Sequence, residues 1–111
     1  MSVNVKTGEV WLAALDPTVG SEIQKTRPCM VVSPPEMHDF LKTVVVVPMT
    51  TGSRHAAFRI PLTFQNKQGL ILLDQIRTLD KSRLVKRLGA IHSSTLDRTL
   101  RTLQTVFEPQ I

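Results

Sequence analysis

The sequence predicts a mainly β domain with a C-terminal α-helix, in which short strands curl into a small barrel. Five or six runs with strand character are joined by turns of Pro, Gly, Ser and Asp, a pattern typical of small barrels. Toward the end of the chain the apolar residues change to a helical period. The 111 residues contain no internal repeat and no long linker, so residues 1–111 are expected to form a single domain.

Three apolar runs predict strands in the first half of the chain. Residues 8–15, GEVWLAAL, are apolar on both faces of an extended segment. Residues 29–33, CMVVS, and 43–49, TVVVVPM, are continuous runs rich in β-branched side chains. Such runs are typical of strands that are covered on both faces.

The segment FRIPL, residues 58–62, alternates in the manner of a strand with one covered face. Phe58, Ile60 and Leu62 are expected to point inward. Pro61 removes a backbone donor, so this strand is expected at an edge of the sheet or at a bulge.

Two further strands are expected before the helix. Residues 69–79, GLILLDQIRTL, are interpreted as one strand opened by Gly69. Residues 83–91, RLVKRLGAI, are interpreted as the last strand, with a β-bulge at Gly89.

Residues 93–107, SSTLDRTLRTLQTVF, predict an amphipathic helix that packs on the barrel or on a second subunit. Its apolar side chains repeat at intervals of four, three and four residues: Leu96, Leu100, Leu103 and Phe107. Ser94 and Asp97 resemble a capping box with Asp in place of the usual Glu or Gln. Pro109 is expected to stop the helix.

The charge and the cysteine content restrict the possible partners and the compartment. The chain has 14 Lys and Arg against 9 Asp and Glu, which gives a net charge of +5. This balance favours polyanionic or acidic partners without choosing between RNA, DNA and an acidic protein. The single cysteine, Cys29, cannot form an internal disulfide, which fits a reducing cytoplasm. No signal peptide and no membrane-spanning run are recognised, so a cytosolic protein with no membrane partner is expected.

Few residues are left to carry chemistry. No group of His, Cys, Asp and Glu has the spacing of a metal site, so neither a metal nor another cofactor is expected. The chain has no phosphate-binding Gly-rich motif and no G-x-S-x-G. Cys29 lies within a predicted strand and is expected to be a buried structural thiol. The remaining candidates are Glu22, Arg27, Thr50 and Asp74.

Arg27 is notable because it precedes Pro28 at the start of a predicted strand. The residue before a proline is held extended, so the guanidinium is preorganised to clamp a phosphate through two hydrogen bonds. A surface ion pair with Glu22 or Glu36 is the alternative. Thr50 ends the next strand, with its hydroxyl at the rim of the barrel, although a β-branched residue in that place needs no function.

Three segments, taken in order, resemble the MazF/PemK family of toxin ribonucleases: GEVWLAALDPTVGSEIQKTRP, VVPMTT and LILLDQIRTLDKSRL. The resemblance runs from about Gly8 to Phe107. It implies a small SH3-like (PemK/CcdB-like) curled barrel with a C-terminal helix, which works as a homodimer in the bacterial cytoplasm. It also implies the toxin of a type II toxin–antitoxin system, with an antitoxin whose acidic, partly disordered C-terminal tail covers the RNA groove.

The resemblance implies sequence-specific, metal-independent cleavage of single-stranded RNA such as mRNA, which inhibits translation and growth. Arg27 and Thr50 match the family's catalytic arginine and threonine, and Glu22 matches a proposed general base. Attack by a ribose 2′-OH leaves a 2′,3′-cyclic phosphate, or its 3′-phosphate, and a 5′-OH. Base recognition is expected from the loops around 16–26 and 51–57. The candidate RNA-binding residues are Ser21, Lys25, Thr51, Ser53, Arg54, His55 and Gln75.

The chain departs from its family in two places. The segment IQKT between Glu22 and Arg27 has no glycine, so this loop is expected to be less permissive in conformation. Some members of the PemK branch carry an arginine two positions before the aspartate of the Asp-Gln pair, where this chain has Leu72. An Arg–Asp catalytic pair of that kind is therefore not expected, and Asp74 is interpreted as a structural hydrogen-bond partner of a loop.

Two alternative functions from other classes remain to be weighed. A CcdB-like gyrase poison shares this fold but uses a tryptophan near the end of the last helix, where this chain reads TVFEPQI. A non-catalytic SH3-like binding module would keep the core and lose the polar residues of the rim. Here Glu22, Arg27 and Thr50 are all present.

Overall fold

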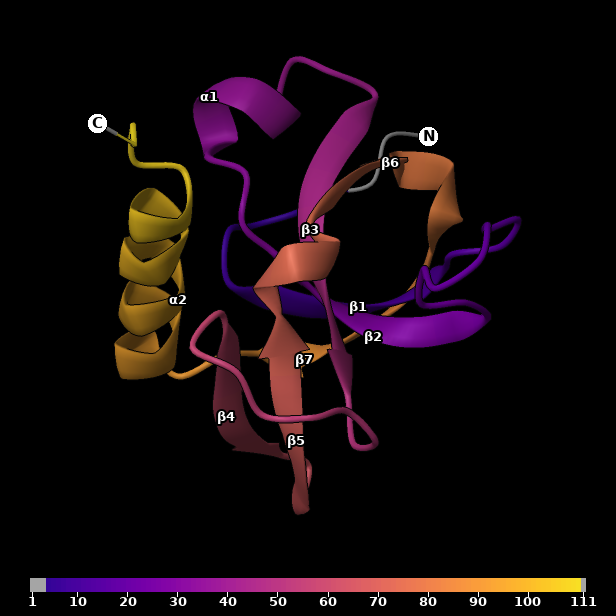
Figure 1. Ribbon diagram of the computed structural model, residues 1–111. Helices are drawn as coiled ribbons and strands as arrows, with labels where there is room; N and C mark the ends of the chain where they lie inside the picture. Colours follow the sequence, from indigo (N-terminus) through magenta and orange to yellow (C-terminus); the bar gives the residue numbers. More distant parts are fainter. Residues whose placement is uncertain (1–3, 111) are drawn as a thin grey trace.

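The computed structural model describes residues 4–110, which form a curled antiparallel sheet with a helix packed on one side (Figure 1). The strands are β1 Glu9–Ala14, β2 Thr26–Val31, β3 Thr43–Thr50, β4 Arg59–Phe64, β5 Lys67–Leu72, β6 Arg77–Asp80 and β7 Leu84–Ala90. The helices are α1 Pro35–His38 and α2 Ser93–Val106, with 3₁₀ turns η1 at Leu73–Gln75 and η2 at Lys81–Arg83. The predicted mainly β fold with a C-terminal helix is confirmed.

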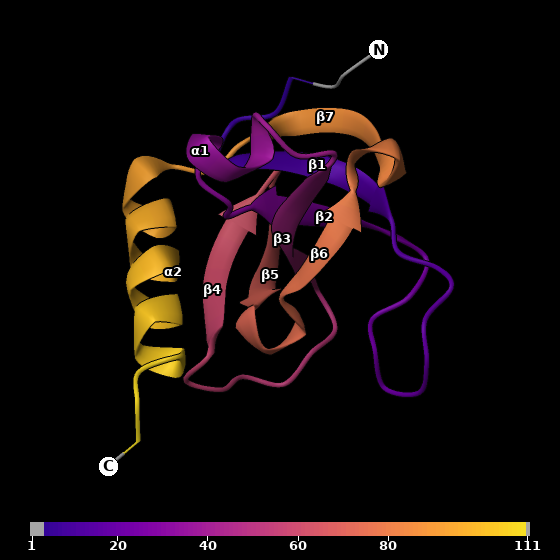
Figure 2. The ribbon, with the colours of Figure 1, turned by 90° about the horizontal axis from the view of Figure 1, so that it is seen from above.

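The sheet is organised around β3. The strands follow the order β4–β5–β3–β2–β1–β7, and β6 pairs with the first half of β3. Because β3 pairs with β6 and β2 along one part and with β5 at its end, the sheet curls around it (Figure 2). The strand β4 lies at the edge, which is where Pro61 predicted it.

The single strand expected over residues 69–79 is wrong, because η1 divides it into β5 and β6. Ile71 pairs with Met49, and Arg77 pairs with Val46. Between these pairs β3 advances by three residues while its partner advances by six, so three extra residues must leave the ladder. They form η1, which is closed by a hydrogen bond from the Ile76 N–H to the Leu73 carbonyl. The side chains of η1 are thereby free to serve the loops.

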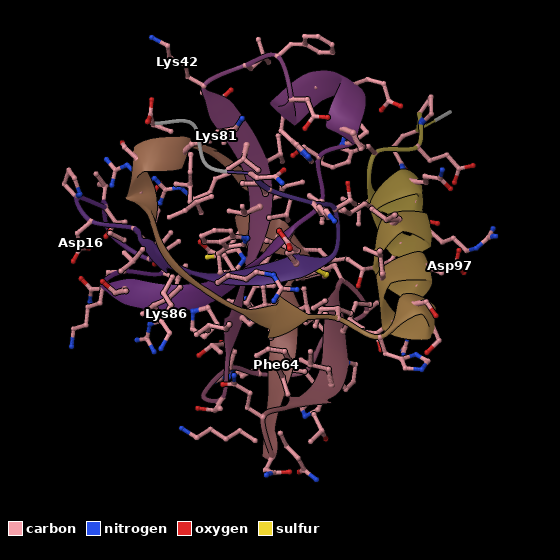
Figure 3. All side chains as sticks on the ribbon, turned by 180° about the vertical axis from the view of Figure 1, so that it is seen from behind. Asp16, Lys42, Phe64, Lys81, Lys86 and Asp97 are labelled. Carbon is pink, nitrogen blue, oxygen red and sulfur yellow. The ribbon has the colours of Figure 1, made fainter. Side chains whose placement is uncertain are left out.

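The last strand, β7, carries the expected bulge. Val10 pairs with Gly89 and Trp11 pairs with Arg87, so the register shifts between them and Leu88 is left unpaired. A Cβ on Gly89 would lie 3.4 Å from the ring of Phe64, which stands at the β4–β5 hairpin next to β7 (Figure 3). The hairpin thus packs closely on the bulge.

Two apolar clusters fill the molecule, one on each face of the sheet. Met30 belongs to the cluster beneath α2, whereas its neighbours Cys29 and Val31 belong to the cluster inside the curl. All three side chains are fully buried. The prediction that this run is covered on both faces is confirmed.

The amphipathic helix is confirmed as α2, which packs on the barrel through Leu96, Leu100 and Leu103. Phe107 does not belong to the buried stripe, and 66% of its surface is exposed. The helix ends at Val106, so Phe107 lies outside its last turn and points to solvent. Within residues 4–110, no helix combines the length and the apolarity needed to span a bilayer.

The expected capping box of Ser94 and Asp97 is wrong. His92 is the N-cap residue, and its Nδ1 accepts a hydrogen bond from the Ser94 N–H. Asp97 instead pairs with Arg101 one turn further along, at 2.8 Å. A helix that begins two residues earlier leaves Asp97 too far along the helix to reach the cap.

The inward placement of Phe58 is also wrong. A turn closed by the Arg59 N–H and the Ala56 carbonyl precedes β4, so Phe58 lies outside the strand and is 42% exposed. The guanidinium of Arg59 covers its ring at 5.9 Å. Ile60 is buried and Leu62 is partly buried, as expected.

Candidate active site

Arg27 and Thr50 are brought together by the pairing of β2 with β3. Cys29 pairs with Pro48, and the same register continued by two residues sets Arg27 opposite Thr50. Both side chains are half-buried. The sequence therefore places a guanidinium and a hydroxyl side by side at the end of a rigid ladder.

These two residues line one cavity of about 230 Å³, here called the Arg27 cavity, together with Thr51, Lys67 and Gly69. The Arg27 Nε–H donates to the Gln24 carbonyl at 3.1 Å, which leaves the terminal nitrogens available. No carboxylate in the part of the chain that the structure describes forms an ion pair with Arg27, so the alternative of pairing with Glu22 or Glu36 is not realised. Two cationic side chains at one cavity favour an anionic ligand such as a phosphate.

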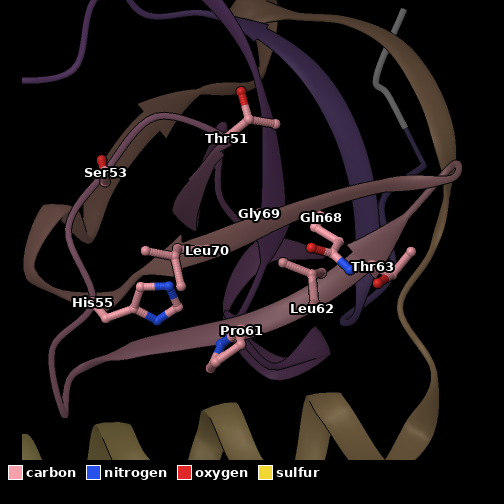
Figure 4. Close-up of a pocket in the computed structure, with 9 residues that line it drawn as sticks. All are labelled: Thr51, Ser53, His55, Pro61, Leu62, Thr63, Gln68, Gly69 and Leu70. Atoms are coloured by element: carbon pink, nitrogen blue, oxygen red, sulfur yellow. The ribbon is translucent and has the colours of Figure 1, made fainter.

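A second cavity of about 510 Å³, the hairpin cavity, adjoins the first and shares Thr51, Leu62 and Gly69 with it. The candidate residues Thr51, Ser53 and His55 line one part of it. Figure 4 shows His55 beside Leu70, while Gln68 and Thr63 lie over the hairpin strands. The two cavities are neighbours through these shared residues and are together called the groove.

Three groove residues of the β4–β5 hairpin were missed by the sequence analysis. Thr63 and Gln68 face each other as a cross-strand pair and line the hairpin cavity, and Lys67 lines the Arg27 cavity. The only signal available in the sequence was the Gln65-Asn66 dipeptide between two strand-like runs. Both residues adopt positive φ, as a tight hairpin turn requires. Recognition of this turn in the sequence would have placed Thr63 and Gln68 opposite each other.

Gly69 allows the closest backbone approach in the groove. A Cβ at this position would lie 2.7 Å from the Thr50 carbonyl oxygen. β5 can therefore pass beside the end of β3 only because residue 69 has no side chain.

Glu22 is not brought to Arg27 and Thr50. It lines a separate cavity of about 560 Å³ with Ser21, Asp74, Gln75 and Arg77. Its Oε1 accepts a hydrogen bond from the Val19 N–H at 2.6 Å, within its own loop. The role of Glu22 as general base stays a prediction.

The first loop, residues 15–25, returns to the barrel through Lys25. Lys25 has φ +71°, which is strained for a residue with a side chain. Its N–H donates to Asp16 Oδ1, and its carbonyl accepts from the Leu15 N–H. Because this segment has no glycine, Lys25 has to adopt the strained conformation at the base of the loop.

Replacing Lys25 with glycine is expected to raise the free energy of unfolding by about 0.5–1 kcal/mol, because relief of the left-handed strain exceeds the extra entropy of the unfolded chain. Urea denaturation measures this change. Lys25→Ala removes the same charge and keeps the strain, so it should not stabilise the protein. Equal stabilisation by both substitutions would contradict the strain.

The second loop, residues 51–58, is linked to η1 through the guanidinium of Arg59. Asp74 accepts from Arg59 Nε at 3.0 Å and Nη2 at 2.8 Å, while Arg59 Nη1 donates to the Arg54 carbonyl at 3.2 Å. Arg59 reaches Asp74 from β4, where it pairs with Leu72. Both oxygens of Asp74 are engaged by a strand residue, which in turn binds the loop, and the structural role of Asp74 stays a prediction.

Hydrogen bonds from Arg59 lower the pKa of Asp74 below its usual range. A carboxyl group whose pKa is lower in the folded state stabilises that state at pH values above the pKa that it has in the unfolded chain. This contribution is lost as the pH falls through the pKa of the folded state. Asp74→Asn is therefore expected to cost about 0.5–1 kcal/mol near pH 7, a modest amount because the pair is partly exposed. The difference from the unsubstituted protein should shrink below about pH 4, as urea denaturation across pH would measure.

The matched control for this experiment is Asp97→Asn on α2. Asp97 also pairs with an arginine, but its side chain is 62% exposed, compared with 29% for Asp74. A smaller effect is expected. A destabilisation by Asp74→Asn that persists unchanged to pH 3 would contradict the role of its charge.

Gln75, predicted to bind RNA, is already engaged with the first loop. Its Oε1 accepts from the Ile23 N–H at 3.2 Å, and its Nε2 donates to the Ser21 carbonyl at 3.4 Å. Arg54 and His55 are exposed in the second loop, and Ser53 is half-buried there. The candidates of the second loop thus lie at the groove, whereas Ser21 and Gln75 line the separate cavity with Glu22.

Cys29 does not contribute a nucleophile. It is fully buried, and burial raises the pKa of its thiol to about 12. The expected structural thiol is confirmed. Across residues 4–110, no three side chains of His, Cys, Asp and Glu gather in a way that could hold a metal ion.

Comparisons with known proteins agree on one family. A family model described as "PemK-like, MazF-like toxin of type II toxin-antitoxin system" matches residues 6–107. The chain is 37% identical to the Escherichia coli protein named endoribonuclease PemK, over 93% of this chain and 82% of that protein. It is 32% identical to endoribonuclease EndoA of Bacillus subtilis, over 90% of this chain and 91% of the relative.

Solved structures share the fold. A crystal structure of MazF from Deinococcus radiodurans matches with a TM-score of 0.83 and 22% identity, over 95% of this chain and 97% of that one. A mycobacterial endoribonuclease in complex with its cognate antitoxin matches with a TM-score of 0.80 and 23% identity, over 97% of this chain and 100% of that one.

Proposed function

Since the chain belongs to the family of PemK-like, MazF-like toxins of type II toxin–antitoxin systems, we propose that it is an endoribonuclease that cleaves single-stranded RNA and thereby arrests growth. The observation that carries the proposal is the Arg27 cavity. It joins a guanidinium, a hydroxyl and an ammonium group at one point of an open groove. This set of donors suits a phosphodiester, and the groove beside it has room for unstacked bases.

The reaction is a transesterification within the RNA strand. A ribose 2′-OH loses its proton to a base, and the 2′-oxygen attacks the adjacent phosphorus. The bond from phosphorus to the 5′-oxygen breaks, and that oxygen leaves with a proton. The products are a 2′,3′-cyclic phosphate and a 5′-OH, and no metal is needed to generate the nucleophile.

Arg27 stabilises the charge that builds on the phosphorane oxygens. Preorganised donors of this kind contribute several kcal/mol to transition-state binding. Thr50 donates its hydroxyl to a non-bridging oxygen. Arg27 is not assigned as the general acid, because a guanidinium with a pKa above about 12 gives up its proton reluctantly.

Glu22 is the candidate for the general base. To act in this way it must leave the Val19 N–H and approach the Arg27 cavity, which requires the first loop to move. Water or another group then protonates the leaving oxygen.

The proposed partners follow from the family. The protein acts as a homodimer in the bacterial cytoplasm, and an antitoxin with an acidic, partly disordered C-terminal tail inhibits it. The net charge of +5 favours both this tail and RNA.

The proposal is tested by incubating the purified protein in excess EDTA with an unstructured RNA pool and with its all-deoxy copy, followed by mapping of the new ends by mass spectrometry. Discrete cuts in RNA alone, with cyclic-phosphate or 3′-phosphate ends, are expected. An intact RNA pool would overturn the proposal and favour a gyrase poison or a non-catalytic binding module.

A further inference from the structure

The turn η1 holds the first loop directly and the second loop through Arg59, by two adjacent side chains. Leu73 anchors the turn in the apolar core, with 1% of its surface exposed. Asp74 and Gln75 follow it directly, outside the strand ladder. A turn fixed at its base can hold its next two side chains at a constant spacing.

Gln75 holds the first loop by its backbone on both sides of Glu22. Its amide accepts from the Ile23 N–H and donates to the Ser21 carbonyl. Ile23 is half-buried and packs against the inner apolar cluster, so this stretch of the loop lies against the barrel. The side chain of Gln75 therefore fixes the segment that carries Ser21 and Glu22.

Asp74 holds the second loop through Arg59. The guanidinium is bound to Asp74 by two of its nitrogens, and a third nitrogen donates to the Arg54 carbonyl. Arg54 stands between Ser53 and His55, which line the hairpin cavity. The carbonyl that is held thus belongs to the loop stretch that faces the groove.

We propose that Asp74 and Gln75 are positioning residues, which set the spacing between the two loops and thereby the bases that the groove accepts. This inference rests on the proposed ribonuclease function and assigns Gln75 to loop positioning in place of direct base reading. Neither residue lines the Arg27 cavity. Loss of the Asp74 contact should therefore weaken RNA recognition and leave the chemical step intact. Loss of the Gln75 contact also frees the segment that carries Glu22, so it is expected to change kcat as well.

The first test needs no RNA. Amide hydrogen exchange is compared in the unsubstituted protein, Gln75→Ala and Asp74→Ala. Gln75→Ala is expected to accelerate exchange of the Ile23 amide at least about fivefold, with little change in residues 51–58. Asp74→Ala should show the reverse pattern. Unchanged exchange at both loops would overturn the proposal.

The second test is cleavage of a randomised single-stranded RNA pool by the same variants. For both variants the KM is expected to rise about tenfold, because a loosened loop binds RNA less well. The kcat of Asp74→Ala should stay within about twofold, whereas Gln75→Ala is not held to that limit because the freed segment carries Glu22. The base preference should broaden at several positions around the cut. Gln104→Ala and Asp97→Ala on α2 are the controls, because Asp97 lies on the opposite side of the molecule from the first loop, which contains Asp16 (Figure 3).

The remaining outcomes are distinguishable. In Asp74→Ala, a lower kcat with unchanged KM and unchanged base preference would mean that the residue supports only the fold. A changed preference at a single position in Gln75→Ala, with normal Ile23 exchange, would assign Gln75 to direct reading of a base. Either result overturns the positioning role, whereas failure of the unsubstituted protein to cleave RNA overturns the proposed function itself.

Discussion

Arg27→Ala is expected to lower kcat about 10²–10³-fold, because the substitution removes the donors that stabilise charge on the phosphorane. Within residues 4–110 its side chain makes one hydrogen bond, to the Gln24 carbonyl, so the midpoint of urea denaturation should hardly change. RNA binding should be reduced far less than turnover. Single-turnover cleavage and a filter-binding titration measure the two quantities separately.

Two companion variants sharpen this prediction. Arg27→Lys keeps the charge but loses the planar fork, so an intermediate kcat is expected. Arg98→Ala removes an exposed arginine from α2 and should cleave normally. If Arg27→Ala cleaves at the full rate, the assignment of the Arg27 cavity as the active site is wrong.

Gly69→Ala is expected to lower both stability and activity. The new methyl group would lie 2.7 Å from the Thr50 carbonyl oxygen, and backbone atoms cannot move aside as a flexible side chain can. Overpacking of this kind costs about 1–3 kcal/mol of unfolding free energy. The displaced end of β3 also carries Thr50 away from Arg27, so kcat should fall by at least about tenfold.

Gly52→Ala is the matched control for this substitution. Gly52 lies two residues after Thr50, and a Cβ there meets nothing within 4 Å. Its N–H donates to Thr50 Oγ1, a contact that alanine retains. Gly52→Ala should therefore stay close to the unsubstituted protein in both measurements. Normal cleavage by folded Gly69→Ala would show that the spacing of β3 and β5 does not control the site.

Most of the fold could be predicted because its strands are read from local patterns. The β-branched run TVVVVPM forms β3, whose buried side chains contribute to both apolar clusters. The division of residues 69–79 was not predicted, because apolar residues flank Asp74 and Gln75 on both sides, at Leu73 and Ile76. Only the register against β3 shows that three residues must leave the ladder.

The positions of Arg27 and Thr50 could be predicted because the backbone around them is restricted. Pro28 fixes the strand beside Arg27, and the β2–β3 register then sets Thr50 opposite it. Thr63 and Gln68 were missed, because an exposed cross-strand pair resembles any polar surface of a hairpin. The contacts of Gln75 with the first loop span more than fifty positions of sequence, and no local pattern reports them.

The central claim is that the RNA supplies its own nucleophile beside Arg27. The most direct test is a short RNA that contains a mapped cleavage site, compared with the same RNA carrying one 2′-deoxynucleotide immediately 5′ of the scissile phosphate. The account predicts complete loss of cleavage at that bond, with binding nearly unchanged. Continued cleavage at the deoxy position would contradict attack by the 2′-OH and would require a different nucleophile.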